Sequence, residues 1–170
     1  LYGVPGSLPF LHLGITTYHD PRPLVGPSPF AAASARHHAD MAVQAVETRR
    51  RWAAAWTRVV ESEHVVAAVK PCRILTGGAS GYLRFPVVAI DRSAARALLE
   101  AGRPAGVGPP YPTTLPELEA AERIAMRTVA TPGADELARS LVTLPTHPRV
   151  QPRDLRTIEG ILRRIAVERG

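Results

Sequence analysis

Residues 28–63 read SPFAAASARHHADMAVQAVETRRRWAAAWTRVVESE, and no proline or glycine follows Pro29 in this stretch. Ser28 is a favoured N-cap residue, and proline suits the first position of a helix because its missing N–H has no partner there anyway. Apolar side chains recur at helical spacings, at Met41, Ala45, Trp52, Trp56 and Val59. The pattern predicts a long helix within residues 28–64, either continuous or broken near His37–His38.

Residues 1–27, upstream of this helix, are rich in proline and glycine. Each proline fixes φ and lacks a backbone donor, so no long helix fits here. We expect an extended segment that lies on a partner surface. The chain starts with Leu1 rather than methionine, and we expect it to begin partway through a longer protein.

Residues 65–170 alternate predicted strands and helices. A transition at 65–71 is followed by a strand at 82–90, helices at 94–101, 115–127 and 134–140, strands near 107 and at 141–144, and a helix from Pro152. In the first strand Leu83, Phe85, Val87 and Ala89 share one face. Pro86 indicates that this strand lies at a sheet edge or is interrupted. This order predicts an α+β fold, with a few strands covered by helices on one face.

Two of these helices have clear terminal signals. Asp91 or Ser93 can cap the helix at 94–101, and Gly102 follows its last turn. Before the final helix, Val150 and Leu155 are spaced as a hydrophobic staple, and Asp154 lies in the first turn. In the long helix, Glu47 and Arg51 are spaced as an i,i+4 ion pair.

The composition excludes several classes of protein. The chain has 170 residues, 45% of them hydrophobic, which is too apolar for a disordered protein. No run of about 18 apolar residues is present, so a membrane span is excluded. With a single cysteine, Cys72, and no export signal, we expect a cytoplasmic protein.

The net charge of +6 raises the alternative of a basic nucleic-acid-binding domain. Only one of the 21 basic residues is lysine, Lys70, and asparagine is absent, which indicates a coding bias rather than a binding surface. The arginines are scattered apart from Arg49–Arg51, and aromatic residues make up 5% of the chain, too few for an evident stacking surface. Nucleic acid is therefore an unfavoured partner.

No complete catalytic or metal-binding set is visible. The six histidines make no ligand signature, and Gly77–Gly81 lacks the Lys-Ser/Thr ending of a phosphate loop and precedes a strand, which favours a hinge. Cys72 is expected to be an inert thiol. Lys70, the single lysine available for a Schiff base, has the sequence context of a surface residue.

Four motifs in order resemble the C-terminal part of DegT-type sugar aminotransferases, pyridoxal-phosphate-dependent enzymes of the aspartate-aminotransferase fold. They are Ser28–Ala33 with Glu47–Arg51 and Ala53; Gly81–Val87; Leu98–Gly102 with Tyr111-Pro112; and Leu141–Pro148 with Asp154. The resemblance implies a long linking helix, followed by a small, mostly antiparallel sheet covered by helices. It divides the chain into the end of a large cofactor domain (1–27), a linking helix (28–64) and a small domain (65–170).

In this family the cofactor lysine lies in the large domain, upstream of the matching region. Lys70 does not occupy the motif position of that lysine, so we assign no catalytic, cofactor-binding or metal-binding residue. Pyridoxal phosphate is implied by resemblance, but we do not expect it to bind this chain alone. The resemblance implies that four residues face the cleft toward the missing domain: Tyr82, Arg84, Tyr111 and His147. Arg84 is suited to an anionic group such as a phosphate or carboxylate.

The favoured hypothesis is therefore the small-domain part of an aminotransferase acting on nucleotide-linked keto sugars. We expect it to be inactive without the large domain, and to function as a homodimer or with a large-domain partner. The alternative from another class is a non-catalytic binding or assembly module that retains the small-domain fold.

Overall fold

The computed structural model describes residues 26–72, 80–110, 114 and 131–169. Its elements in chain order are α1 (Pro29–His37), α2 (Ala39–Val60), β1 (Val69–Pro71), β2 (Phe85–Ala89), α3 (Arg92–Gly102), the 3-10 helix η3 (Arg103–Ala105), α5 (Pro132–Ser140), β3 (Leu141–Leu144) and α6 (Pro152–Val167). The three strands form one antiparallel sheet in the order β1-β2-β3. The α+β prediction is confirmed. The expected helix at 115–127 lies outside the described residues.

The long helix forms, but with the predicted break. The Ser28 hydroxyl accepts from the Ala31 N–H at 3.1 Å, as expected for an N-cap. At His38 ψ is 3°, far from the helical value of about −42°, and α2 starts afresh at Ala39. The helix ends at Val60, earlier than the boundary near 64, because residues 61–68 turn back toward β1.

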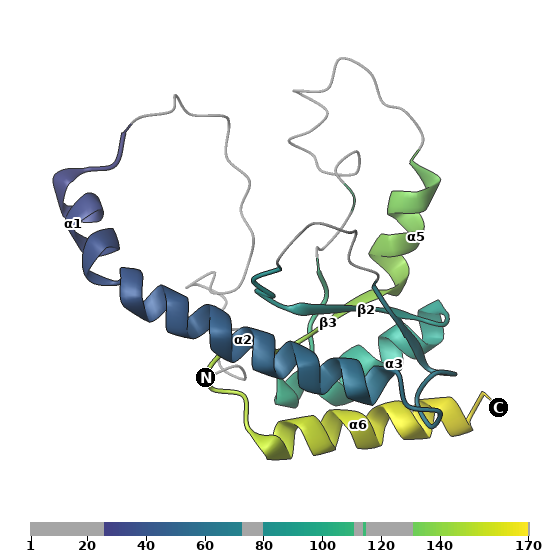
Figure 1. Ribbon diagram of the computed structural model, residues 1–170. Helices are drawn as coiled ribbons and strands as arrows, with labels where there is room; N and C mark the ends of the chain where they lie inside the picture. Colours follow the sequence, from purple (N-terminus) through teal and green to yellow (C-terminus); the bar gives the residue numbers. More distant parts are fainter. Residues whose placement is uncertain (1–25, 73–79, 111–113, 115–130, 170) are drawn as a thin grey trace.

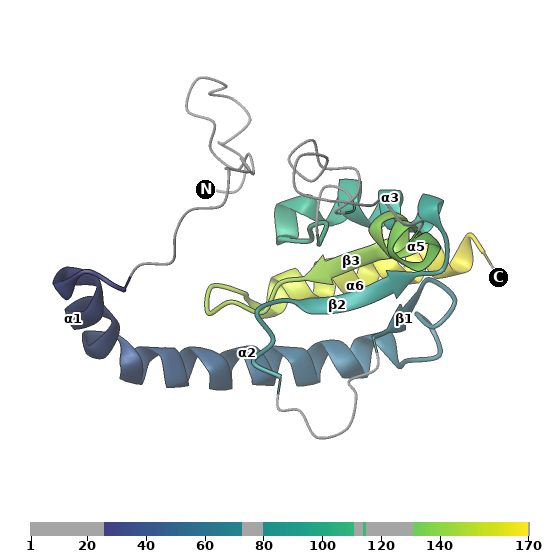
Figure 2. The same cartoon turned by 90° about the horizontal axis from the view of Figure 1, so that it is seen from above.

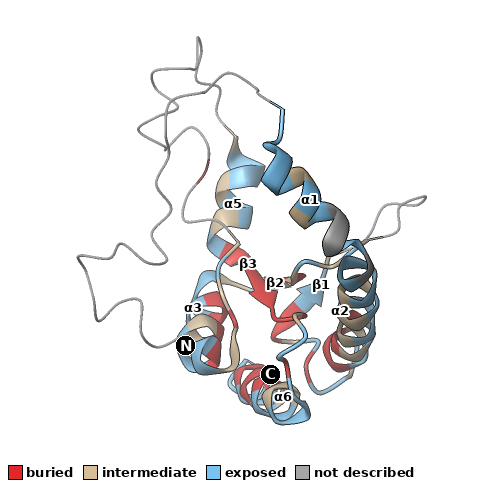
Figure 3. Ribbon diagram, turned by 90° about the vertical axis from the view of Figure 1, so that its left-hand side faces the viewer, coloured by how far each residue is buried: buried red, intermediate tan, exposed pale blue. Residues whose placement is uncertain are grey.

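Helices α2, α3 and α6 cover one face of the sheet, and the core lies between them (Figure 1 and Figure 3). The inward residues of β2 are Phe85, Val87 and Ala89, all buried as predicted. Leu83, expected on the same face, is 75% exposed because it precedes the strand. The core is completed by Trp56 of α2, Leu98 of α3 and the apolar stripe of α6.

Strand β2 is central, so the edge position predicted from Pro86 is wrong. A proline in a central strand would leave a neighbouring strand without a backbone N–H partner, and the register of the sheet avoids this loss. Pro86 pairs with Thr143 of β3, whereas the short strand β1 pairs only with Val87–Ala89. The proline therefore lies beyond the end of β1, where no β1 residue requires its missing N–H. Strand β1 itself lies in the segment that the sequence indicated only as a transition.

Terminal signals were confirmed for α3 and α6. The Asp91 carboxylate accepts from the Ala94 N–H at 2.8 Å, and Asp154 accepts from the Gln151 N–H at 2.9 Å to complete a capping box. Gly102 is the last residue of α3, and packing requires a glycine there because a Cβ would lie 2.5 Å from Cγ2 of Val107. The left-handed turn comes later, at Gly106 with φ of 90°.

Helix α1 and the first turns of α2 extend beyond the sheet (Figure 2). Met41, part of the predicted apolar stripe, is 55% exposed for this reason, and Phe30 and Val43 are also exposed. The stripe becomes a core-facing surface only from Trp52 onward. In the described part of the chain no helix combines the length and apolar character needed to cross a bilayer.

Candidate functional site

After β3 the chain continues through Pro145 and Thr146 into a turn at 147–150, where the Val150 N–H donates to the His147 carbonyl. The segment that leads into this turn is fixed from two sides. The indole N–H of Trp56 donates to the Pro145 carbonyl at 2.8 Å, in a fully buried contact. The buried Thr146 hydroxyl donates to two carbonyl oxygens, that of Tyr82 at 2.6 Å and that of Leu83 at 3.0 Å. This segment therefore holds the start of β2 against α2.

Tyr82 has a strained backbone at this contact. Its φ is 44°, and among the described residues it is the one non-glycine in the left-handed region. That conformation costs a non-glycine residue about 1–2 kcal/mol. The Tyr82 N–H donates to the Ser80 hydroxyl at 3.1 Å, and the ring stacks on Phe85 with centroids 6.0 Å apart. Strain of this kind is typical of functional sites, where neighbouring contacts maintain it.

Arg84 spans β2, β3 and the turn after α3. Its Nε donates to the Thr143 hydroxyl at 2.6 Å, and one Nη donates to the carbonyls of Gly106 at 2.6 Å and Thr143 at 3.0 Å. The Thr143 hydroxyl in turn donates to the Gly108 carbonyl at 2.8 Å. Gly108 also bridges Thr143 through both backbone groups, so the strand predicted near residue 107 is reduced to a single bridge. Arg84 thus fastens this turn to the sheet.

His147 is partly buried beside these groups. Its Nδ1 accepts from the Arg149 N–H at 3.2 Å, which leaves the proton of the neutral ring on Nε2. Burial lowers the pKa of His147, and the positive charges of Arg84 and Arg149 lower it further, while Asp154 opposes them. The ring is therefore held in its neutral form at neutral pH, as a donor at Nε2.

Three of the four cleft candidates, Tyr82, Arg84 and His147, are brought together at one end of the sheet. Tyr111 lies outside the described residues. The group places the positive charge of Arg84 beside an aromatic ring and a neutral imidazole, and such a charge suits an anionic group. No described residue here forms a nucleophile and base pair.

The remaining chemical candidates lie elsewhere. Lys70 is exposed on β1, where its backbone pairs with Val88. Burial raises the pKa of the Cys72 thiol, which makes it a weaker nucleophile at neutral pH. Across the described ranges, no group of three or more histidine, cysteine or acidic residues is placed to hold a metal ion.

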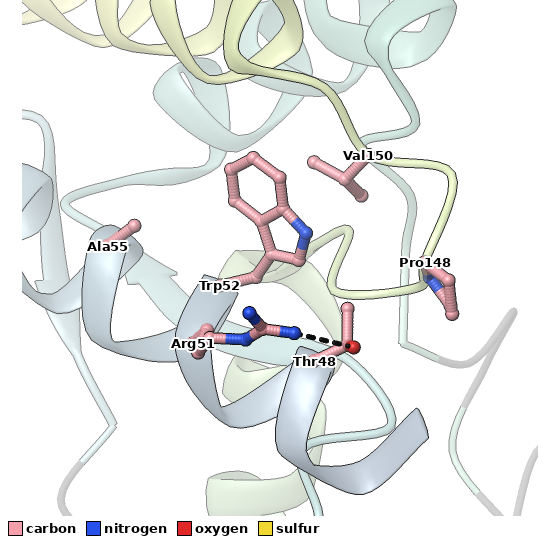
Figure 4. A pocket seen from close by; sticks show the side chains of 6 residues that line it. All are labelled: Thr48, Arg51, Trp52, Ala55, Pro148 and Val150. Carbon is pink, nitrogen blue, oxygen red and sulfur yellow. Dashed lines mark hydrogen bonds between the residues drawn. The ribbon is translucent and has the colours of Figure 1, made fainter. Parts of the chain in front are cut away.

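A groove of about 370 Å³ lies next to this site, between α2 and the loop that follows His147 (Figure 4). Its lining residues are Thr48, Arg51, Trp52, Ala55, Pro148 and Val150, and we call it the Trp52 groove. The four helical members have the spacing i, i+3, i+4 and i+7, which is the signal in the sequence that could have identified this wall. The two loop members follow His147 by one and three residues. The sequence interpretation treated Arg51 and Trp52 as helix residues only.

Arg49 was noted as an interruption of the apolar stripe. Its Nε is shielded from solvent, and no described residue accepts a hydrogen bond from it. A buried donor without an acceptor costs about 1–3 kcal/mol. The face of α2 that carries Arg49 therefore contains a polar group that the described chain does not satisfy.

No family model matches the sequence, and no curated protein matches it. Comparison with solved structures gives aminotransferases. A DegT DnrJ EryC1 StrS aminotransferase from Brucella abortus superposes with a TM-score of 0.62 and 22% identity over 93% of this chain and 41% of that chain. For the aminotransferase TlmJ from Streptoalloteichus hindustanus, the TM-score is 0.61 and the identity 22%, over 81% of this chain and 36% of that one.

S. venezuelae DesV, solved in complex with a ketimine intermediate, has a TM-score of 0.67 and 18% identity over 95% of this chain and 43% of its own. The chain thus spans less than half the length of each of these structures. At these identities the likeness establishes the fold. The resemblance expected from the four motifs is confirmed, and this chain has the fold of part of a DegT-type sugar aminotransferase.

Proposed function

We propose that these residues form the small-domain part of an aminotransferase-like protein, with the linking helix at 28–64 and the small domain at 65–170. In this proposal the whole protein transfers an amino group to a nucleotide-linked keto sugar. The observation that carries the proposal is the superposition of almost the whole chain on part of several aminotransferases.

The described residues do not fit a site that anchors pyridoxal phosphate. Anchoring requires an amine inside a pocket, and the single lysine of the chain, Lys70, is exposed on β1 and does not line the Trp52 groove. When bound in such enzymes, the cofactor supplies an electron sink for amino transfer. We therefore assign this chain the opposite wall of the cleft, at Tyr82, Arg84, Tyr111 and His147, and no step through the cofactor.

These residues would bind and orient substrate. The guanidinium of Arg84 donates to Thr143 and Gly106, and its positive charge would attract a phosphate or carboxylate of the substrate. The Tyr82 ring, stacked on Phe85, would line the same wall. The exposed apolar residues Phe30 and Met41 and the unsatisfied Nε of Arg49 are consistent with further protein covering α1 and α2. A second copy or a separate large-domain chain would each supply that cover.

The test compares this chain with the product of the complete reading frame that contains it. Each is incubated with glutamate, pyridoxal phosphate and a panel of nucleotide-linked keto sugars, and amino sugars are detected by mass spectrometry. We expect product from the complete protein and none from this chain. Product from this chain alone would overturn the assignment as a partial domain. A reading frame that forms no product and encodes no cofactor domain would favour the binding or assembly module instead.

A further inference from the structure

The backbone bends immediately before β2, at Tyr82 and Leu83. In a regular strand successive carbonyl groups point to opposite sides. The carbonyls of these two residues instead both accept from the single hydroxyl of Thr146, at 2.6 and 3.0 Å. Such convergence requires a backbone that is not extended, and the φ of 44° at Tyr82 provides it.

This bend decides which side chain lies beside Phe85. Residues an odd number of positions apart in a strand lie on opposite faces, so a straight strand would place Leu83 with Phe85 and turn Tyr82 away from both. The structure has the reverse arrangement. The Tyr82 ring stacks on Phe85 and packs against the core, whereas Leu83 is 75% exposed.

Thr146 supplies a donor where the backbone ladder between β2 and β3 ends. The register pairs Phe85 with Leu144, and its continuation places Thr146 opposite Leu83. Pro145 lies between Leu144 and Thr146 and has no N–H, so the ladder cannot continue through it. The side-chain hydroxyl of Thr146 contacts the two carbonyls instead.

Thr146 is also anchored independently of the bend. It is fully buried, and the carbonyl of the preceding Pro145 accepts from Trp56 of α2 at 2.8 Å. The Tyr82 N–H donates to the Ser80 hydroxyl at 3.1 Å, but Ser80 belongs to the same segment and would move with it. The Thr146 hydroxyl is therefore the hydrogen-bonding group that fixes the bend relative to the sheet.

We propose that Thr146 is a positioning residue of the cleft wall, whose hydroxyl holds the bend and thereby places the Tyr82 ring, rather than Leu83, beside Phe85. The proposal rests on the proposed function for the contact between Tyr82 and substrate. Loss of the hydroxyl leaves two carbonyls without their donor and removes the contact that keeps Tyr82 in the left-handed region. The strand then straightens, and Leu83 replaces Tyr82 beside Phe85.

The test is NMR of the isotope-labelled 170-residue chain and its Thr146→Val and Thr146→Ser variants. In the unchanged chain we expect nuclear Overhauser effects between the ring protons of Tyr82 and Phe85, whose centroids are 6.0 Å apart. In Thr146→Val these effects should be lost, and effects between the Leu83 methyl groups and the Phe85 ring should appear. Thr146→Ser retains a hydroxyl and should keep the pattern of the unchanged chain.

Two further variants complete the design. Thr57→Val is the matched control, because the Thr57 hydroxyl donates to the Ala53 carbonyl within α2, and it should keep the effects between Tyr82 and Phe85. Leu83→Asp tests the bend even if Thr146→Val does not fold. The Leu83 side chain is exposed, so the urea midpoint of Leu83→Asp should fall by no more than about 0.5 M. A straight strand would turn the aspartate toward Phe85 and the core, and would lower the midpoint by more than about 1 M.

The link to substrate is tested in the product of the complete reading frame. Thr146→Val should raise KM for the keto sugar by about threefold or more with little change in kcat, because a misplaced Tyr82 loses a contact made equally in the ground and transition states. Thr146→Ser should restore the KM. An unchanged KM in Thr146→Val would show that Thr146 does not position a substrate contact.

The NMR outcomes do not depend on activity, so they separate this inference from the proposed function. Effects between Tyr82 and Phe85 that persist in a folded Thr146→Val chain would overturn the inference. Their loss in both Thr146→Val and Thr146→Ser would also overturn it, because the hydroxyl would then not be the cause. The expected NMR pattern, together with no amino transfer by the complete protein, would confirm that Thr146 holds the bend and overturn the proposed reaction.

Discussion

Trp56→Phe is the substitution that best tests how the turn after β3 is held. The Trp56 side chain is fully buried, and its N–H donates to the buried Pro145 carbonyl at 2.8 Å. Phenylalanine fills most of the same space but cannot donate. The Pro145 carbonyl is then left without its partner, at a cost of about 1–3 kcal/mol. The smaller ring also leaves a small void, which adds about 1 kcal/mol.

The expected loss in the free energy of unfolding is therefore about 2–4 kcal/mol. With a urea m-value of about 2 kcal/mol/M, the midpoint should fall by about 1–2 M. Far-UV circular dichroism is the suitable signal, because tryptophan fluorescence changes with the substitution itself. Trp52→Phe is the matched control on the same helix, since Trp52 is half-buried and its N–H has no described acceptor. Its midpoint should fall by no more than about 0.5 M.

A comparable fall in both variants would refute this reasoning, because it would show that ring volume and not the hydrogen bond matters. A negligible fall in Trp56→Phe would show that the turn does not depend on this contact.

Three further predictions concern stability, each measured by urea unfolding. Gly102→Ala should destabilise the chain by about 1–3 kcal/mol because the new Cβ meets Val107. Gly160→Ala, in the middle of α6 with open space around it, should stabilise the chain by about 0.5–1 kcal/mol. The opposite order would contradict the packing argument. Asp91→Ala should cost about 1 kcal/mol through loss of the α3 cap, and no loss would mean that the cap is dispensable. The pKa of His147 is lowered in the folded chain, so the unfolded chain binds a proton at this residue more readily, and the free energy of unfolding should decline as pH falls below about 6.5. His147→Asn should reduce that decline. An identical pH profile in the variant would contradict the assignment.

The parts of the fold that the sequence predicted well depend on local interactions. The caps at Ser28 and Asp91 and the strand at 141–144 are specified by residues within a few positions of each other. The break near His38 was offered as an alternative on the same local grounds. In each case the deciding contact spans about one helical turn, so it can be inferred without knowing the tertiary structure.

The parts that failed depend on pairing between distant segments. The central place of β2 follows from β1, a three-residue strand whose sequence has little strand character of its own. Pro86 does lack a partner on one side, as predicted, because β1 ends before that position. The strand as a whole is nevertheless central, so the edge prediction was wrong. The exposure of Met41 depends on how far α2 extends past the sheet, which helical periodicity cannot reveal.

For the candidate site, the sequence identified Tyr82, Arg84 and His147, and the structure places them together. The sequence did not identify what fastens them. Thr143, Thr146 and Trp56 make contacts across 59 to 89 residues of chain. Trp56 and Thr146 donate to backbone carbonyls, which leave no signal in the amino-acid sequence, and Thr143 accepts from the side chain of Arg84. The role of these candidates in binding substrate stays a prediction.

The central claim is that this chain forms one wall of a cleft and does not itself anchor the cofactor. Equilibrium dialysis of the chain and its Lys70→Arg variant against pyridoxal phosphate, with borohydride reduction and mass spectrometry of the retained protein, tests it most directly. The account predicts no stoichiometric retention, and the same result for both proteins. One equivalent retained by the chain, attached to Lys70 and lost in Lys70→Arg, would contradict it.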